Sequence, residues 1–113
     1  MKISSSESKE KHPDNSTTIW EHDLPTHSIG LATGKINGRH PESGWIKNTQ
    51  CELVYYCISG QGTVTIENEP FTLQAGDVLL IEKNKKYFIE GQDLFICLPS
   101  SPAWTPEQAK SVE

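Results

Sequence analysis

Two tyrosines, Tyr55 and Tyr87, are the side chains best placed to do chemistry in this sequence. Each lies in a short run of apolar, aromatic and β-branched residues, which is typical of a strand. A phenol can orient a ligand or carry a proton without a metal. Because side chains alternate across a strand, the period that turns Tyr55 inward also turns Leu53 and Cys57 inward, and Ile89 follows Tyr87. These inward-facing residues predict one of two interiors. One is a mostly apolar pocket with two phenols, and the other is a packed core, since small barrels usually fill themselves with side chains.

Metal and nucleophile chemistry has few candidates. The histidines match no metal-binding spacing, and the three cysteines form no CxxC pair, so their odd number indicates reduced thiols. Ligands converge in space and not in sequence, so a non-standard metal site built from His40, Glu42 or Glu52 at the mouth of the fold stays open. The histidines are His12, His22, His27 and His40, and the cysteines are Cys51, Cys57 and Cys97.

The elements that must position these residues are short strands. Apolar runs follow one another about every ten residues between turn signals such as Ala75-Gly76-Asp77, and no helical period separates them. Such spacing indicates an antiparallel sandwich or barrel and excludes a parallel sheet, which needs crossover helices. The runs are Glu52 to Ile58, Thr63 to Ile66, Phe71 to Leu73, Val78 to Ile81, Tyr87 to Ile89 and Leu94 to Leu98.

The spacing of glycines in this half of the chain resembles the two motifs of the cupin superfamily, G-x5-H-x-H-x3,4-E-x6-G and G-x5-P-x-G-x2-H-x3-N. Gly60 anchors the end of the first motif and Gly76 the start of the second. The resemblance covers roughly residues 28–108 and is that of a small single-domain bacterial cupin. It implies an all-β fold, an antiparallel jelly-roll β-barrel.

The positions at which the resemblance implies metal ligands hold other residues. The glutamate position is Leu53 and the second motif's histidine position is Tyr87. The two remaining histidine positions are Lys47 and Thr49, or Asn48 and Ile46 if the longer gap applies. Divalent first-row metals want imidazole, carboxylate or thiolate donors, so we expect no metal and no cofactor. We assign no catalytic residue. The candidate ligand-binding residues are Trp45, Tyr55, Tyr87, Lys47, Thr49, His40 and Glu52.

Composition suits one domain. A chain of 113 residues with 35% hydrophobic content can bury one core but has no membrane span, and a net charge of -5 argues against nucleic-acid binding. Residues 1–18 are rich in serine and charge, so we expect a flexible N-terminal tail, followed by a single barrel domain over residues 19–113. The tail has no hydrophobic region typical of a signal peptide, so a cytoplasmic location is expected.

Three further segments carry expectations. The stretch Gly38 to Asn48 should be a loop at the barrel rim, where Trp45 caps the core or stacks on a ligand. The closing segment, Pro99 to Gln108, should lie extended across the barrel with Trp104 as its anchor. Val54, Tyr56 and Ile58 should face outward together, which predicts a homodimer.

Three functions stay open at this point. The first is a metal-free barrel that binds a small molecule, such as a sugar-like or carboxylate metabolite, without catalysis. The second is a metal-independent isomerase or epimerase with a tyrosine as acid, which suffers from the lack of a histidine on the predicted strands. The third is a structural or interaction module whose barrel is plugged.

Overall fold

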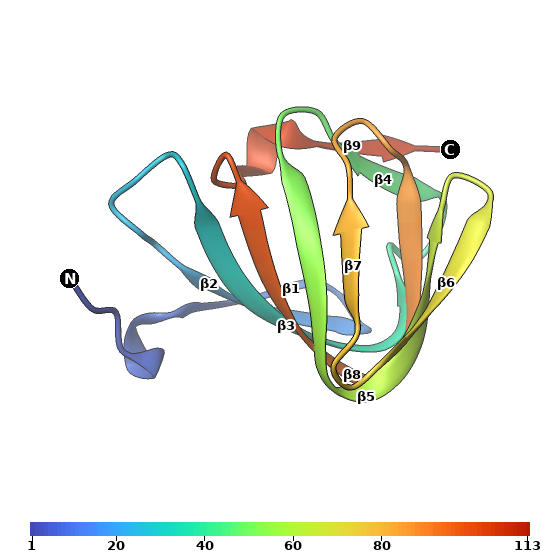
Figure 1. Ribbon diagram of the computed structural model, residues 1–113, viewed down its shortest axis with the longest axis horizontal. Coiled ribbons are helices and arrows are strands. Elements are labelled where there is room, and N and C mark those ends of the chain that lie inside the picture. Colours follow the sequence, from blue (N-terminus) through green and yellow to red (C-terminus); the bar gives the residue numbers. More distant parts are fainter.

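Nine antiparallel strands form one sheet that curls into a half-barrel (Figure 1). The computed structural model describes residues 1–113. The predicted all-β antiparallel cupin fold is confirmed. The strands are β1 (Lys9–Asp14), β2 (Thr17–His22), β3 (Gly30–His40), β4 (Trp45–Asn48), β5 (Glu52–Ile66), β6 (Glu69–Gln74), β7 (Val78–Ile81), β8 (Tyr87–Ser101) and β9 (Ala109–Val112). The helical turns η1 (Ser5–Glu7) and η2 (Pro106–Gln108) have three residues each, so no helix could cross a membrane.

Two long bent strands organise the sheet. β5 and β8 have 15 residues each and pair with one another, and each joins two of the runs predicted separately. The turn expected at Gly60 is a bend inside β5, where the register against β8 shifts. Gly60 has a φ of 75°, and a Cβ there would collide with the backbone of Asp93. Glycine therefore lets β5 pass from one side of the half-barrel to the other.

The remaining strands extend the sheet on both sides. The order is β1-β2-β3-β8-β4-β9, while β5 also pairs with β6 and β7. Sequence reasoning did not predict β2 and β3. β3 places its last residue, His40, opposite Ile89 of β8.

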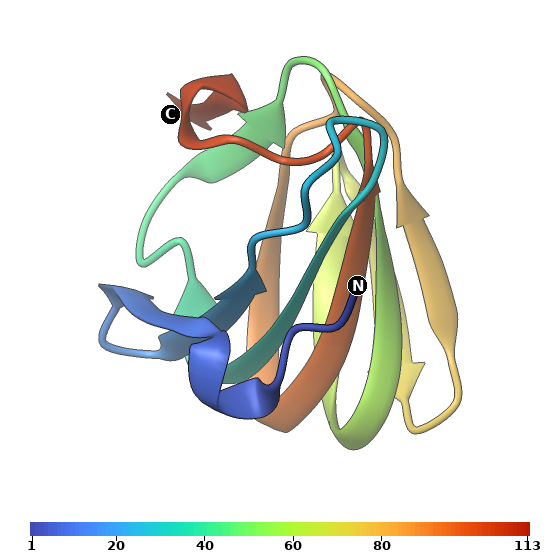
Figure 2. The same ribbon diagram turned by 90° about the vertical axis from the view of Figure 1, so that its left-hand side faces the viewer.

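The N-terminal segment differs from the flexible tail expected over residues 1–18. β1 pairs with β2 as a hairpin that lies beside β3 (Figure 2). Lys11 forms an ion pair with Glu21 at 2.8 Å, and the Trp20 indole donates to Glu10 at 3.1 Å. The composition argument counted apolar side chains, whereas a strand at a sheet edge is held mainly by its backbone ladder.

The predicted rim loop and the closing segment both differ in part from expectation. Strand structure covers both ends of the predicted rim loop, so only residues 41–44 form a loop between β3 and β4. Arg39 fixes this loop by donating to the Pro41 and Gly44 carbonyls at 2.7 and 2.9 Å. The closing segment is extended only in part, because β8 continues to Ser101 whereas Pro106–Gln108 form the helical turn η2. β9 then pairs with β4 at the same end of the barrel in both views (Figures 1 and 2).

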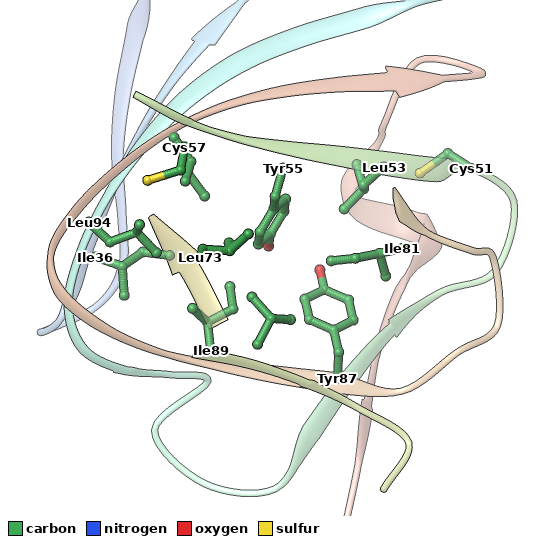
Figure 3. Packing of buried hydrophobic residues seen from close by; sticks show 12 residues of the cluster. Ile36, Cys51, Leu53, Tyr55, Cys57, Leu73, Ile81, Tyr87, Ile89 and Leu94 are labelled. Atoms are coloured by element: carbon green, nitrogen blue, oxygen red, sulfur yellow. The ribbon is translucent and has the colours of Figure 1, made fainter. Parts of the chain in front are cut away.

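The core lies between the two halves of the bent sheet (Figure 3). The predicted inward row is confirmed, because Leu53, Tyr55, Cys57, Tyr87 and Ile89 are all buried there. The opposite side of β5 and β7 is apolar and open to solvent, with Tyr56 42% and Val78 64% exposed. We call this surface the apolar outer face; it consists of Val54, Tyr56, Ile58, Val78 and Leu80.

Candidate functional site

A cavity of about 770 Å³ opens into the barrel at the end that holds Tyr55 and Tyr87. Its walls come from the N-terminal hairpin, the β2–β3 connection, the inner face of the sheet and the C-terminal segment. The volume lies in the range of small-molecule sites. The barrel thus has a packed core in one part and a cavity in another.

The two phenols meet across this interior. Tyr55 on β5 and Tyr87 on β8 have ring centroids 6.1 Å apart and planes at 89°, and their rings lie close together in the barrel (Figure 3). Burial raises the pKa of Tyr55 well above its usual value. Burial also raises the pKa of Tyr87, although contacts with Tyr55 and Asn48 oppose that rise. Both phenols therefore keep their protons near neutral pH and can act as hydrogen-bond donors.

His40 also lines the cavity, and its side chain is paired with a carboxylate outside the wall. His40 Nδ1 lies 2.6 Å from Asp14 Oδ2, and the two side chains are only 17% and 9% exposed. Burial alone would raise the pKa of Asp14, but the hydrogen bond with His40 and other donors outweigh it and lower that pKa. An ionised carboxylate only accepts hydrogen bonds, so His40 Nδ1 carries the proton. Its Nε2 is then the basic nitrogen available to a ligand.

The turn between β1 and β2 brings Asp14 to this position. The side chain of Asp14 also accepts the Ser16 backbone N–H at 3.0 Å, which is the local bond that aspartate makes in a turn. Asn37 of β3 donates its backbone N–H to the Ser16 carbonyl at 2.8 Å, and Asn15 donates to the Glu42 carboxylate at 3.2 Å. The hairpin is thus tied to β3 and to the loop that follows His40.

The sheet register places His40 near Tyr87. His40 pairs with Ile89, and Ile89 is fully buried on the inner face of β8. Residues opposite one another in an antiparallel pair share a face, so His40 points inward. Tyr87 is two residues from Ile89 on the same face, which makes it a diagonal neighbour of His40, about 7–8 Å away between backbones. A small ligand could therefore contact a base and a phenol at once.

Two further polar residues support the phenols. Asn48 is 4% exposed and its amide nitrogen lies 3.4 Å from the Tyr87 hydroxyl. The Trp104 indole N–H donates to the Asn48 side-chain oxygen at 2.8 Å. Both residues line the cavity.

The structure places three of the seven candidate ligand-binding residues in the cavity wall. These are His40, Tyr55 and Tyr87. The other four lie outside the wall. β4 turns Ile46 and Asn48 inward, as in the longer-gap register, and so turns Trp45 and Lys47 outward, while Thr49 and Glu52 lie beyond the end of β4. Trp45 packs on Phe88 with centroids 4.9 Å apart, and Thr49 donates to the Gln108 carbonyl; Lys47 and Glu52 also lie outside the wall.

The residues considered for a non-standard metal site do not come together. No group of three or more His, Cys, Asp or Glu side chains is close enough to hold a metal ion. His40 binds Asp14, while Glu42 accepts a backbone N–H of the N-terminal turn. Cys51 is buried, and burial raises the pKa of its thiol, so it is not an activated nucleophile.

Sequence reasoning missed Asp14 as a site residue. It assigned Asp14 to a flexible tail, although the run Asp14-Asn15-Ser16 is typical of a turn and the residues Thr17 to Trp20 are β-branched or aromatic, as is typical of a strand. Reading these signals as a hairpin would have placed a carboxylate beside β3.

The comparisons with known proteins agree with this geometry. Residues 35–91 match the family described as cupin domain (Cupin_2), which is about half of the chain. No curated protein matches significantly in sequence.

Several solved structures share the fold. Pac13, described as a unique nucleoside dehydratase, is 18% identical, with a TM-score of 0.90 over 100% of this chain and 91% of that one. Variants of the Streptomyces protein with a histidine changed to glutamine, or a tyrosine changed to phenylalanine, have structures with uridine. Ectoine synthase from P. lautus is 12% identical, with a TM-score of 0.69 over 88% of this chain and 78% of that one. Because the matched residues span half of the chain and these folds agree, the chain belongs to the cupin domain family.

Proposed function

We propose that this chain is a metal-free cupin enzyme that binds a sugar-like or nucleoside-like molecule and eliminates water from it by acid–base chemistry. The observation that carries the proposal is that His40, held by Asp14, lies in the wall of a cavity that Tyr55 and Tyr87 also line. An oriented base and a buried phenol on one inner face are the two groups that a dehydration needs. The lack of a histidine on the predicted strands counted against catalysis. That objection does not apply, because His40 is the last residue of β3.

The reaction would use one proton transfer at each group. His40 Nε2 removes a hydrogen from carbon, and the electron pair of that C–H bond forms a carbon–carbon double bond. The hydroxyl on the next carbon leaves with its bonding electrons and takes the proton of Tyr87, so water is released. Proton transfer from the imidazolium to the phenolate, directly or through water, restores both groups.

The strength of the base limits the substrate. Imidazole is a weak base, so it removes a proton from carbon only where an adjacent carbonyl stabilises the resulting charge. The substrate class is therefore a sugar or nucleoside with an aldehyde or ketone next to the C–H bond. Asp14 would stabilise the imidazolium that forms, as a carboxylate does in other histidine pairs.

The comparison with Pac13 supports a nucleoside as the first ligand to test. That protein is described as a nucleoside dehydratase, and its variants with uridine alter one histidine and two tyrosines. Two tyrosines and His40, which is paired with Asp14, also line the cavity of this chain, together with His12, His22 and His27. The cavity is large enough for a molecule of that size.

The second candidate is binding or epimerisation in the same cavity. Apolar walls with convergent phenols and an amide would hold a small ligand without any reaction. An epimerase would share the first proton transfer and then return the proton to the other face of the carbon. These readings differ in their products and not in the residues they use.

One experiment separates the candidates. Uridine and a panel of its derivatives oxidised to an aldehyde or ketone on the ribose are incubated with the protein in deuterated water and followed by mass spectrometry and NMR. A dehydratase gives a product that has lost one water. An epimerase gives deuterium on carbon without loss of water, and a binding protein gives a calorimetric signal without either. The proposal is contradicted if no compound loses water, takes up deuterium or gives a binding signal.

A further inference from the structure

A chain of polar contacts leads from the C-terminal segment to the phenol of Tyr87. The Trp104 indole nitrogen lies 2.8 Å from the side-chain oxygen of Asn48, and the Asn48 amide nitrogen lies 3.4 Å from the Tyr87 oxygen. The three residues belong to separate parts of the fold, namely the segment after β8, strand β4 and strand β8.

The hydrogen-bond donors in this series of contacts fix the direction of each hydrogen bond. An indole N–H can only donate, so the oxygen of the Asn48 amide must face Trp104 and its NH₂ group must face Tyr87. An amide NH₂ also only donates, so the Tyr87 oxygen accepts. A phenol that accepts at its oxygen still has its own proton to give, and that proton must point away from Asn48.

The second phenol lies beside Tyr87 within the barrel. The rings of Tyr55 and Tyr87 pack edge to face with centroids 6.1 Å apart, and both residues line the cavity. Because Asn48 donates to the Tyr87 oxygen, the proton of that hydroxyl is left for the side of the cavity.

We infer that Trp104 is a positioning residue, which acts through Asn48 to aim the hydroxyl proton of Tyr87 into the cavity. The role as a device for proton delivery rests on the proposed function, whereas the orientation of the hydroxyl does not. Neither Trp104 nor Asn48 needs to touch the reacting atoms for this effect.

The C-terminal segment is held in a way that suits this role. The backbone N–H of Trp104 donates to Ser100 at 3.0 Å, and the side chain of the buried Gln108 donates to the Ala103 carbonyl at 3.0 Å. β9 then pairs with β4, where Ala109 lies opposite Asn48. The indole is thus fixed relative to the amide that it orients.

A mutant cycle on turnover tests the inference. Trp104→Phe keeps an aromatic ring and removes the N–H, and we expect kcat to fall about tenfold to a hundredfold while KM stays within about threefold, because general-acid catalysis contributes about 10²–10⁴. Asn48→Asp keeps the size of the side chain and replaces the donor with an acceptor, so it should lower kcat at least as much. In a Tyr87→Phe background the Trp104→Phe change should cause no further loss, whereas additive losses would overturn the inference.

A measurement without turnover separates this inference from the proposed function. The chain has three tyrosines, so labelling their ζ carbons with ¹³C gives a simple NMR spectrum. Trp104→Phe and Asn48→Asp should both move the Tyr87 resonance, identified by its loss in Tyr87→Phe, and leave that of the exposed Tyr56 in place. An unmoved Tyr87 resonance in folded Trp104→Phe protein would overturn the inference even if the enzyme proved active. Lack of turnover in the wild-type protein, together with a shifted Tyr87 resonance in Trp104→Phe, would contradict only the proposed function.

Discussion

Replacing Tyr87 with phenylalanine removes the hydroxyl oxygen that the Asn48 side chain contacts. The ring keeps its place in the core, where Tyr87 is 3% exposed. The variant leaves the Asn48 amide, itself 4% exposed, without the acceptor that lies 3.4 Å away. An unsatisfied buried donor costs about 1–3 kcal/mol, and the length of this contact argues for the lower half of that range.

The expected loss of stability is therefore about 1–2 kcal/mol. For a chain of this size each kcal/mol lowers Tm by roughly 4 °C or more, which scanning calorimetry resolves easily. Tyr56→Phe is the matched control; Tyr56 is 42% exposed, and its substitution should change stability by less than about 0.5 kcal/mol. If a nucleoside binds in the cavity, Tyr87→Phe should also weaken uridine binding by about 1–3 kcal/mol in a calorimetric titration. A Tm at or above that of the wild-type protein, with uridine affinity unchanged, would refute the hydrogen-bonded role of this hydroxyl.

Further predictions concern metal content, assembly, the bend in β5 and acid stability. Elemental analysis of the purified protein should find zinc, iron, manganese and nickel well below one equivalent, since no suitable donors cluster; one equivalent lost on changing His40 would contradict this. The apolar outer face should join two copies of the chain, so light scattering should give a dimeric mass and Tyr56→Glu a monomeric one; a monomeric wild type would contradict the assignment. Gly60→Ala forces a φ of 75° and a collision with Asp93, so it should destabilise the fold by more than about 1 kcal/mol in urea unfolding, and a neutral effect would mean that β5 bends elsewhere. The pKa of Asp14 in the folded protein is lowered from about 3.8, so its ionised form stabilises the fold above pH 3.8 and this stabilisation is lost as the pH falls through the folded pKa. The free energy of unfolding of Asp14→Asn should therefore fall less steeply with acid than that of the wild-type protein. The same pH dependence in both proteins would contradict this role of Asp14.

The barrel could be predicted from the sequence because its signals are local. Alternating apolar residues and glycine-containing turns identified the inner rows of β5 and β8, including Tyr55 and Tyr87. The two motifs added the curled antiparallel architecture of a cupin. What they could not give is the continuity of each long strand, since a glycine bend and a true turn have the same composition.

The site could be predicted only in part because half of it comes from segments with little apolar character. Asp14 lies in a hairpin that composition assigns to a flexible tail, and backbone pairing, not apolar burial, holds it in place. Lys47 and Thr49 were candidates on the shorter-gap register, whereas β4 follows the longer-gap one, and a one-residue slip reverses which side chains face inward. His40 was identified as a candidate, but its partner could not be, because the two are 26 residues apart in the sequence.

The role of His40 as the base is tested most directly by comparing the wild-type protein with His40→Gln on the oxidised uridine panel in deuterated water. We expect the wild-type protein to eliminate water from at least one compound. We expect His40→Gln, folded and still able to bind uridine, to do so about 10² to 10⁴ times more slowly. An equal rate in His40→Gln would contradict the assignment of His40 as the base, and uridine binding without any reaction in the wild-type protein would show that the cavity binds its ligand without catalysis.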